Sequence, residues 1–204
     1  MSTVPNANKV QSLAAKLAAR FKNAAPDQGF GSLGVWPNEP TSSDITADLT
    51  DLVVNWEGKF QYNAANKQRV TLPCLEVQPH YTWHEGPSGA MTFKGRSIQI
   101  PFDLPGNFPD NQRQRVEIGE RHLKGQLTGL LGYEPTDLGA ALTEATALIA
   151  AAKEQNTAVA VLLHLDIPTK NGKAEVMNKK DYIRGIASAP VVDTSGDSSD
   201  NSQT

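Results

Sequence analysis

The order of strand-like and helix-like segments constrains the fold of this chain more than any single motif does. Apolar and polar residues alternate over residues 51–62 and again over 69–84, which is typical of half-buried β-strands. Further along the chain, apolar residues recur at helical spacing through a long block that interrupts the series of strands. In chain order the segments are strands at 51–62, 69–84 and 91–102, the helical block at 110–153, and strands at 158–167 and 180–187.

Three strands, a helical region and two further strands form the element order of the OB-fold, a small Greek-key barrel that commonly binds oligonucleotides. We therefore expect a mainly β fold with α insertions, an OB-fold-like five-stranded barrel over residues 51–190. Gly132 and Thr136 should divide the block between strands 3 and 4 into two helices, because glycine ends helices and threonine caps them. The apolar phase of the third strand changes near Gly95, which predicts a β-bulge there.

Residues 1–24 predict an N-terminal amphipathic helix. Its apolar residues recur at spacings of three and four, and its lysines and arginine lie elsewhere on the cylinder. One interpretation is a helix docked on the body of the protein or on a neighbouring subunit. Another is a basic arm that contacts nucleic acid or a membrane. The apolar residues are Val10, Leu13, Leu17 and Phe21.

Two polar regions complete the chain. Residues 25–50 are rich in glycine and proline and predict a connector. Residues 191–204 contain three of the 22 acidic residues and no lysine or arginine, and predict a disordered acidic tail. The rest of the chain then balances 19 basic with 19 acidic residues. A nucleic-acid site would therefore have to concentrate positive charge on one face.

Cellular location and redox chemistry follow from what the composition lacks. No apolar run is long enough for a membrane span, and the N-terminus has no apolar stretch typical of a signal peptide. We expect a cytoplasmic protein with no membrane partner. Cys74 is the only cysteine, which excludes an intrachain disulfide and the paired-cysteine zinc patterns.

Residues that catalyse reactions or bind metals form no recognisable pattern. The histidines are dispersed at 80, 84, 122 and 164, and His80 and His84 would lie about 13 Å apart along a strand. The chain contains neither a phosphate-binding glycine loop nor a nucleophile elbow. Cys74 has no evident activating neighbour. We therefore expect no enzymatic activity, no cofactor and no metal site.

Basic residues near the ends of the strands are the strongest candidates for contacts with nucleic acid. In an OB-fold, the loops that join strands 1–2 and 4–5 flank the binding face. We predict phosphate contacts by basic residues of these loops and of the third strand, and base stacking on an aromatic ring. The alternative stays open that these lysines are ordinary solvent-exposed residues of a hairpin loop and contact no phosphate. The candidate DNA-binding residues are Lys67, Arg69, Lys94, Arg96, Lys170, Lys173, Lys179, Lys180, Tyr182 (the stacking ring) and Arg184.

The second half of the chain resembles a group of phage-encoded OB-fold proteins that are associated with replication and recombination genes. The resemblance covers about 95–190 and rests on Gly95-Arg96-Ser97, the helix RVEIGERHLKGQLTGLLG (115–132) and the ending NGKAEVMNKKDYIRGIASAP (171–190). It implies a non-catalytic single-stranded-DNA-binding protein of phage-type replication or recombination. It also implies the host cell cytoplasm as location, and replication or recombination proteins as partners.

A protein–protein interaction or assembly module built on an OB-like barrel is the alternative function. The balanced charge of residues 1–190 and the amphipathic N-terminal helix favour it. In that case the apolar stripe of residues 1–24 would hold a homo-oligomer together.

Overall fold

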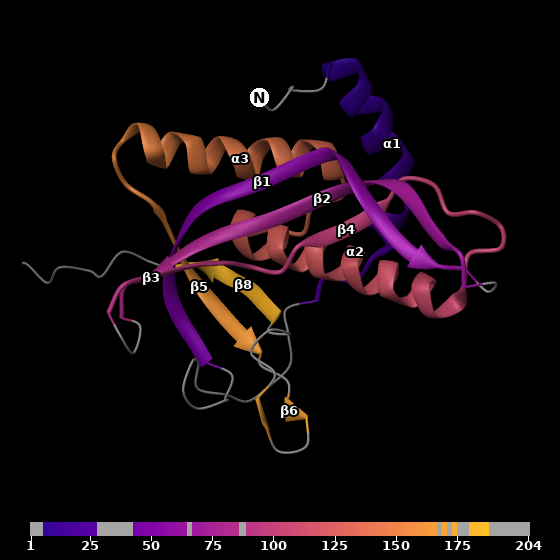
Figure 1. Cartoon of the computed structure of the whole chain (residues 1–204). Coiled ribbons are helices and arrows are strands. Elements are labelled where there is room, and N and C mark those ends of the chain that lie inside the picture. The colour runs from indigo at the N-terminus through magenta and orange to yellow at the C-terminus, as the bar shows by residue number, and fades with distance from the viewer. Residues whose placement is uncertain are drawn as a thin grey trace, which may run out of the picture.

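A computed structural model describes residues 6–27, 43–64, 67–85, 89–166, 169–170, 173–174 and 180–187. Figure 1 shows an antiparallel sheet packed against helices. The helices are α1 (Ala7–Asn23), α2 (Asp110–Leu131) and α3 (Leu138–Glu154). The strands are β1 (Ser43–Asn63), β2 (Arg69–Trp83), β3 (Met91–Lys94), β4 (Ile98–Pro101), β5 (Val159–Asp166), β6 (Thr169–Lys170), β7 (Lys173–Ala174) and β8 (Lys180–Ile186).

The six-stranded sheet is built around β1, which takes part in both of its halves. The strand order is β3-β2-β1-β5-β8, with β4 also paired to β2. Residues 43–49 of β1 pair with β5, and residues 48–63 pair with β2. Register shifts after Leu49 and after Asn55 interrupt the ladder with β2, and such irregularities bend a strand. One strand can therefore serve two differently oriented parts of the sheet.

The predicted irregularity near Gly95 is confirmed, because the third strand-like segment is two short strands. β3 ends at Lys94 and β4 begins at Ile98, and both pair with β2. A Cβ atom at Gly95 would clash with the carboxylate of Asp181 and with the ring of Pro79. Glycine is required here because the chain turns a corner against β8 with no room for a side chain.

The predicted OB-fold-like five-stranded barrel is not confirmed: among the described residues the six-stranded sheet stays open. α2 contacts both β4 and β8, which are strands at the two ends of the sheet. The side-chain amide of Gln126 donates a hydrogen bond to the carbonyl oxygen of Asp181 (2.5 Å) and accepts one from the N–H of Ile183 (3.0 Å). This helix side chain thus satisfies edge groups of β8 that a closing strand would otherwise pair.

Close contact between α2 and β8 depends on a glycine. A Cβ at Gly129 would clash with the carbonyl group of Ile183. Figure 1 shows α2 running alongside β4, and Gly119 lies next to Ile98 of that strand. The apolar stripe of α2 faces the core between these strands, where Val116, Leu123 and Leu127 are buried.

The N-terminal helix α1 is docked on the body of the protein, as one of its two interpretations predicted. Leu17 and Phe21 are each 1% exposed, so the centre of its apolar stripe is covered. Two of its lysines pair with body carboxylates: Lys9 with Glu57 and Lys16 with Asp103, each at 2.6 Å. A homo-oligomer formed through this stripe would first have to undock the helix. No helix in the described part of the chain is both long and apolar enough to cross a membrane.

Candidate nucleic-acid interface

The tip of the β1–β2 hairpin holds the first group of predicted cations. Lys67 lies in the turn with a φ of 63° and is exposed. Arg69 begins β2, is also exposed, and donates a hydrogen bond to the side chain of Gln61 across the ladder. Lys59 is exposed on the same strand as Gln61 and two residues before it, so both side chains point to the same face. This end of the hairpin presents three positive charges to solvent.

The corner between β3 and β4 holds the second group. Lys94 is exposed and lies opposite His80 of β2. Arg96 is half-buried, and its backbone N–H donates a hydrogen bond of 2.6 Å to the carboxylate of Asp181. Because Asp181 is fully buried, the backbone of this corner is fixed while the two cationic side chains remain at its surface.

The third group was predicted in the loop between the last two strands of the main sheet. β6 and β7 form a small antiparallel ladder of their own, in which Lys170 lies opposite Lys173. Lys180 begins β8 opposite Asp166. For these three lysines the structure describes the backbone alone, and Lys179 lies outside the described residues. Their phosphate contacts stay predictions.

The structure places the three groups apart rather than on one compact patch. In Figure 1 the tip of the β1–β2 hairpin, the β3 corner and the β6–β7 ladder lie at separate edges of the molecule. Arg69 and His80 are eleven residues apart on β2, which separates the first two groups by at most about 36 Å along the strand. A flexible single strand can bridge such a distance, because the site size of OB-type binders extends over several nucleotides.

The stacking role predicted for Tyr182 is wrong for the folded protein. The side chain is only 3% exposed. Its ring meets the imidazole of His122 edge-on at 4.7 Å, and the imidazole of His164 lies at 6.2 Å. No face of the ring is therefore open to a base. Arg184, two residues further along β8, is half-buried.

Ion pairing separates the cations of this protein into two classes. Lys9, Lys16 and Lys153 each lie within 3.3 Å of a carboxylate. By contrast, Lys67, Arg69, Lys94 and Arg96 form no ion pair with any acidic side chain of the described ranges. Within the described part of the chain, these four predicted site cations thus have no carboxylate to displace before they could meet a phosphate.

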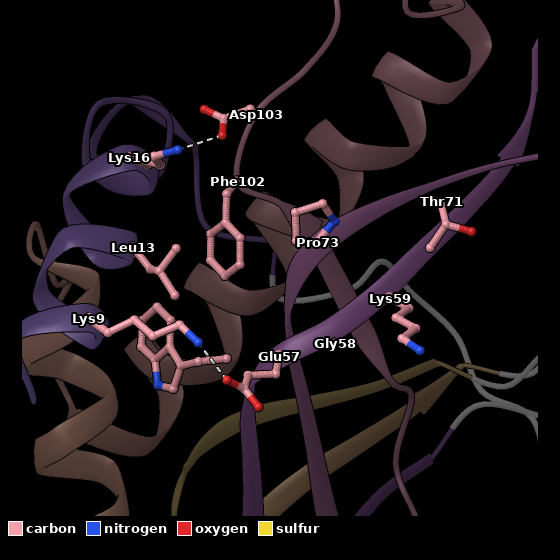
Figure 2. A pocket seen from close by; sticks show the side chains of 11 residues that line it. Lys9, Leu13, Lys16, Glu57, Gly58, Lys59, Thr71, Pro73, Phe102 and Asp103 are labelled. Carbon is pink, nitrogen blue, oxygen red and sulfur yellow. Dashed lines mark hydrogen bonds and ion pairs between the residues drawn. The ribbon is translucent and has the colours of Figure 1, made fainter. Parts of the chain in front are cut away.

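A groove of about 390 Å³ lies between α1 and the β1–β2 ribbon (Figure 2). At its floor the rings of Trp56 and Phe102 stack with centroids 6.3 Å apart and planes 7° apart. Both rings are more than nine-tenths buried, and the Lys9–Glu57 ion pair crosses the groove wall. The stacked rings stabilise the docking of α1 and offer little free aromatic face to a ligand.

Arg115 of α2 is a further cation that was not among the candidate DNA-binding residues predicted from the sequence. It lines the same small pocket as Arg96, together with Gly119 and His122. Positions 115, 119 and 122 share one face of a helix, since they are four and three residues apart. That spacing was visible in the sequence, but the position of β4 beside this face was not.

Burial raises the pKa of two acidic groups in the interior, Cys74 and Glu120. Burial, aided by the charge of Glu76, raises the pKa of the Cys74 thiol to about 12. Burial likewise raises the pKa of Glu120, against the opposing effect of Arg20. A thiol with so high a pKa is a poor nucleophile. Among the described residues, no three His, Cys, Asp or Glu side chains are grouped closely enough to hold a metal ion.

Comparisons with protein-family models, with curated proteins and with solved structures found no match for this chain.

Proposed function

We propose that this protein binds single-stranded DNA without catalysing a reaction. One observation carries the proposal: the cations at both ends of the β2 ribbon have no ion pairs among the described residues, whereas Lys9 and Lys16 of α1 and Lys153 of α3 do. A protein gains affinity for nucleic acid from each phosphate that it neutralises, because bound counterions are released. Cations that are free of protein carboxylates make that contact at the lowest cost.

The topology supports the same proposal. We propose that the sheet is an OB-type barrel whose last closure is made by side chains and a helix instead of a strand ladder. β1 pairs with both β2 and β5, and Asp181 of β8 accepts a hydrogen bond from the backbone of Arg96 at the β3–β4 corner. Strand 5 of an OB-fold approaches strand 3 in the same place.

The mode of binding follows from the positions of the groups. Lys67 and Arg69 would hold the strand at one end of the ribbon, and Lys94 and Arg96 at the other. Because the ring of Tyr182 is buried, binding relies on phosphate contacts and is tolerant of sequence. The resemblance to phage-encoded OB-fold proteins supports a role in phage replication or recombination. The alternative of an assembly module loses its main support, since the apolar stripe of α1 is already covered.

Fluorescence anisotropy of a labelled oligo-dT, titrated with the full chain at low salt, tests the proposal. The double variants K67Q/R69Q and K94Q/R96Q should each weaken binding roughly tenfold, because each removes two charge-assisted contacts. K153Q is the matched control, since Lys153 is already paired with the carboxylate of Asp51 at 3.3 Å. Equal affinities for all three variants and the unmodified chain would refute this interface.

A further inference from the structure

A small pocket lies in the seam between the free edge of β4 and α2. Residues 96–99 line it on the strand side, and Arg115, Gly119 and His122 line it on the helix side. Its volume is about 110 Å³, the space of roughly three to four water molecules in the liquid. That space suits a single tetrahedral oxyanion better than a base or a sugar.

Two arginines from different elements line this pocket, Arg96 beside β4 and Arg115 on α2. Arg115 is fixed by its position over the ring of Phe60, with 4.9 Å between the guanidinium carbon and the ring centroid. Neither Arg96 nor Arg115 forms an ion pair with an acidic side chain in the ranges that the structure describes. Arg20 shows the contrast, since its guanidinium lies 2.8 Å from Glu120.

The backbone of β4 adds a polar group to the same seam. Phe102 donates its N–H to the carbonyl of Pro73, so the alternation of the antiparallel ladder turns the peptide groups of Gln99 away from β2. In agreement, the carbonyl oxygen of Gln99 lies beside Gly119 of α2. A carbonyl oxygen is an acceptor and does not attract an anion, so the attraction for an anion in this pocket comes from the arginines.

One acidic side chain is bonded to residues of the pocket wall and opposes an anion there. The carboxylate of Glu76 accepts hydrogen bonds from Ser97 Oγ at 2.7 Å and from Gln99 Nε2 at 3.2 Å. Those two donors satisfy Glu76 without either arginine. The positive charges of Arg96 and Arg115 therefore remain available to a ligand. Replacing Glu76 removes a negative charge, so its effect on anion binding should be opposite to that of replacing an arginine.

We propose that this pocket binds one phosphate group between the guanidinium groups of Arg96 and Arg115. Planar guanidinium groups bind phosphate oxygens in pairs, which gives geometric specificity beyond simple charge attraction. The phosphate of a single-stranded DNA backbone and free inorganic phosphate share this chemistry. The first source rests on the proposed function, and the second does not.

Two measurements on the full chain separate these sources. The first is the shift in melting temperature on exchanging chloride for inorganic phosphate at constant ionic strength. The second is the affinity for labelled oligo-dT. Both use R96Q and R115Q, with R121Q as the matched control, because Arg121 is exposed on α2 outside the pocket. The change that phosphate causes within each variant is compared, so a variant of lower stability remains informative.

We expect R96Q and R115Q to lose the phosphate-induced shift and to bind oligo-dT about tenfold more weakly, with R121Q unchanged. E76Q should bind both ligands equally well or about twofold more tightly, because it removes an opposing charge. If neither measurement separates R96Q and R115Q from R121Q, the pocket proposal is overturned. If all three variants nevertheless bind oligo-dT, the proposed function still stands. A phosphate-induced shift without any oligo-dT binding would keep the pocket and remove the proposed function.

Discussion

The carboxylate of Asp181 accepts a hydrogen bond of 2.9 Å from the hydroxyl of Tyr81 inside the core, where both side chains are at most 1% exposed. The same carboxylate accepts the N–H of Arg96 at 2.6 Å and the side-chain amide of Gln126 at 3.1 Å. One buried residue of β8 thereby links β2, the β3–β4 corner and α2. The open sheet keeps its shape because these side-chain bonds act where strand pairing is missing.

Replacing Tyr81 with phenylalanine should lower the free energy of unfolding by about 1–3 kcal/mol. The change removes one buried donor and leaves the Asp181 carboxylate with fewer partners in a dry environment. Urea unfolding monitored by circular dichroism measures the effect. Y133F is the matched control, because Tyr133 donates its hydroxyl to Glu144 on the exposed surface. An unfolding curve of Y81F that overlays those of Y133F and the unmodified chain would contradict the role of this bond.

The stability contribution of Tyr81 should disappear at alkaline pH. Burial, reinforced by the charge of Asp181, raises the pKa of Tyr81 well above its usual range. In the unfolded chain the hydroxyl ionises at about pH 10. The contribution of Tyr81 to the free energy of unfolding is therefore complete below that pH and is lost as the pH rises toward the folded pKa. The difference in urea midpoint between the unmodified chain and Y81F should therefore shrink above about pH 10. A difference that stays constant up to about pH 11 would argue against a buried, neutral hydroxyl.

Two glycines of α2 should respond to alanine in opposite directions. Gly129→Ala places a methyl group against the carbonyl of Ile183 and should destabilise the fold by about 1–3 kcal/mol or more, because α2 must move away from β8. At Gly119 a Cβ would lie 3.7 Å from Ile98, an ordinary contact. Gly119→Ala should therefore leave stability unchanged or raise it by up to about 1 kcal/mol through helix propensity. Thermal unfolding of both variants checks the pair, and equal effects would contradict the contact of α2 with β8.

The thiol of Cys74 should be protected from chemical modification while the protein is folded. It is 0% exposed, and its pKa of about 12 leaves almost no thiolate near neutral pH. Reaction with Ellman's reagent should follow the rate of unfolding and accelerate in urea. A C74A/T71C variant supplies the control, since Thr71 is exposed on the same strand and should react as a free thiol. Rapid labelling of Cys74 in native buffer would contradict its burial.

Local sequence patterns were sufficient for most elements of the fold. Alternation of apolar and polar residues located the strands, and the phase change at Gly95 located the break between β3 and β4. The start of β1 at Ser43 was missed, although Ile45, Ala47 and Leu49 alternate with polar residues just as the later part of the strand does. The nearby glycines and prolines of residues 25–43 concealed that signal.

Features that depend on distant parts of the chain could not be predicted in this way. Nothing local to Tyr182 shows that His122 of α2 covers its ring, so its exposure was misjudged. Likewise, Gln126 has the appearance of an ordinary helix residue until β8 is placed beside it. That Lys67 and Arg96 form no ion pair with a described acidic residue also depends on neighbours in three dimensions. The sequence predicts which residues are positively charged, but it does not predict which of them lie beside an acidic partner in the fold.

The most direct test of single-stranded-DNA binding is the salt dependence of the affinity for oligo-dT. The logarithm of the binding constant should fall linearly with the logarithm of salt concentration, with a slope of about −0.7 for each phosphate that the protein neutralises. The variant K67Q/R69Q/K94Q/R96Q should lose up to about 3 units of that slope, since it removes four cations that have no ion pair within the described ranges. No binding at low salt, or binding that salt does not weaken, would contradict the account.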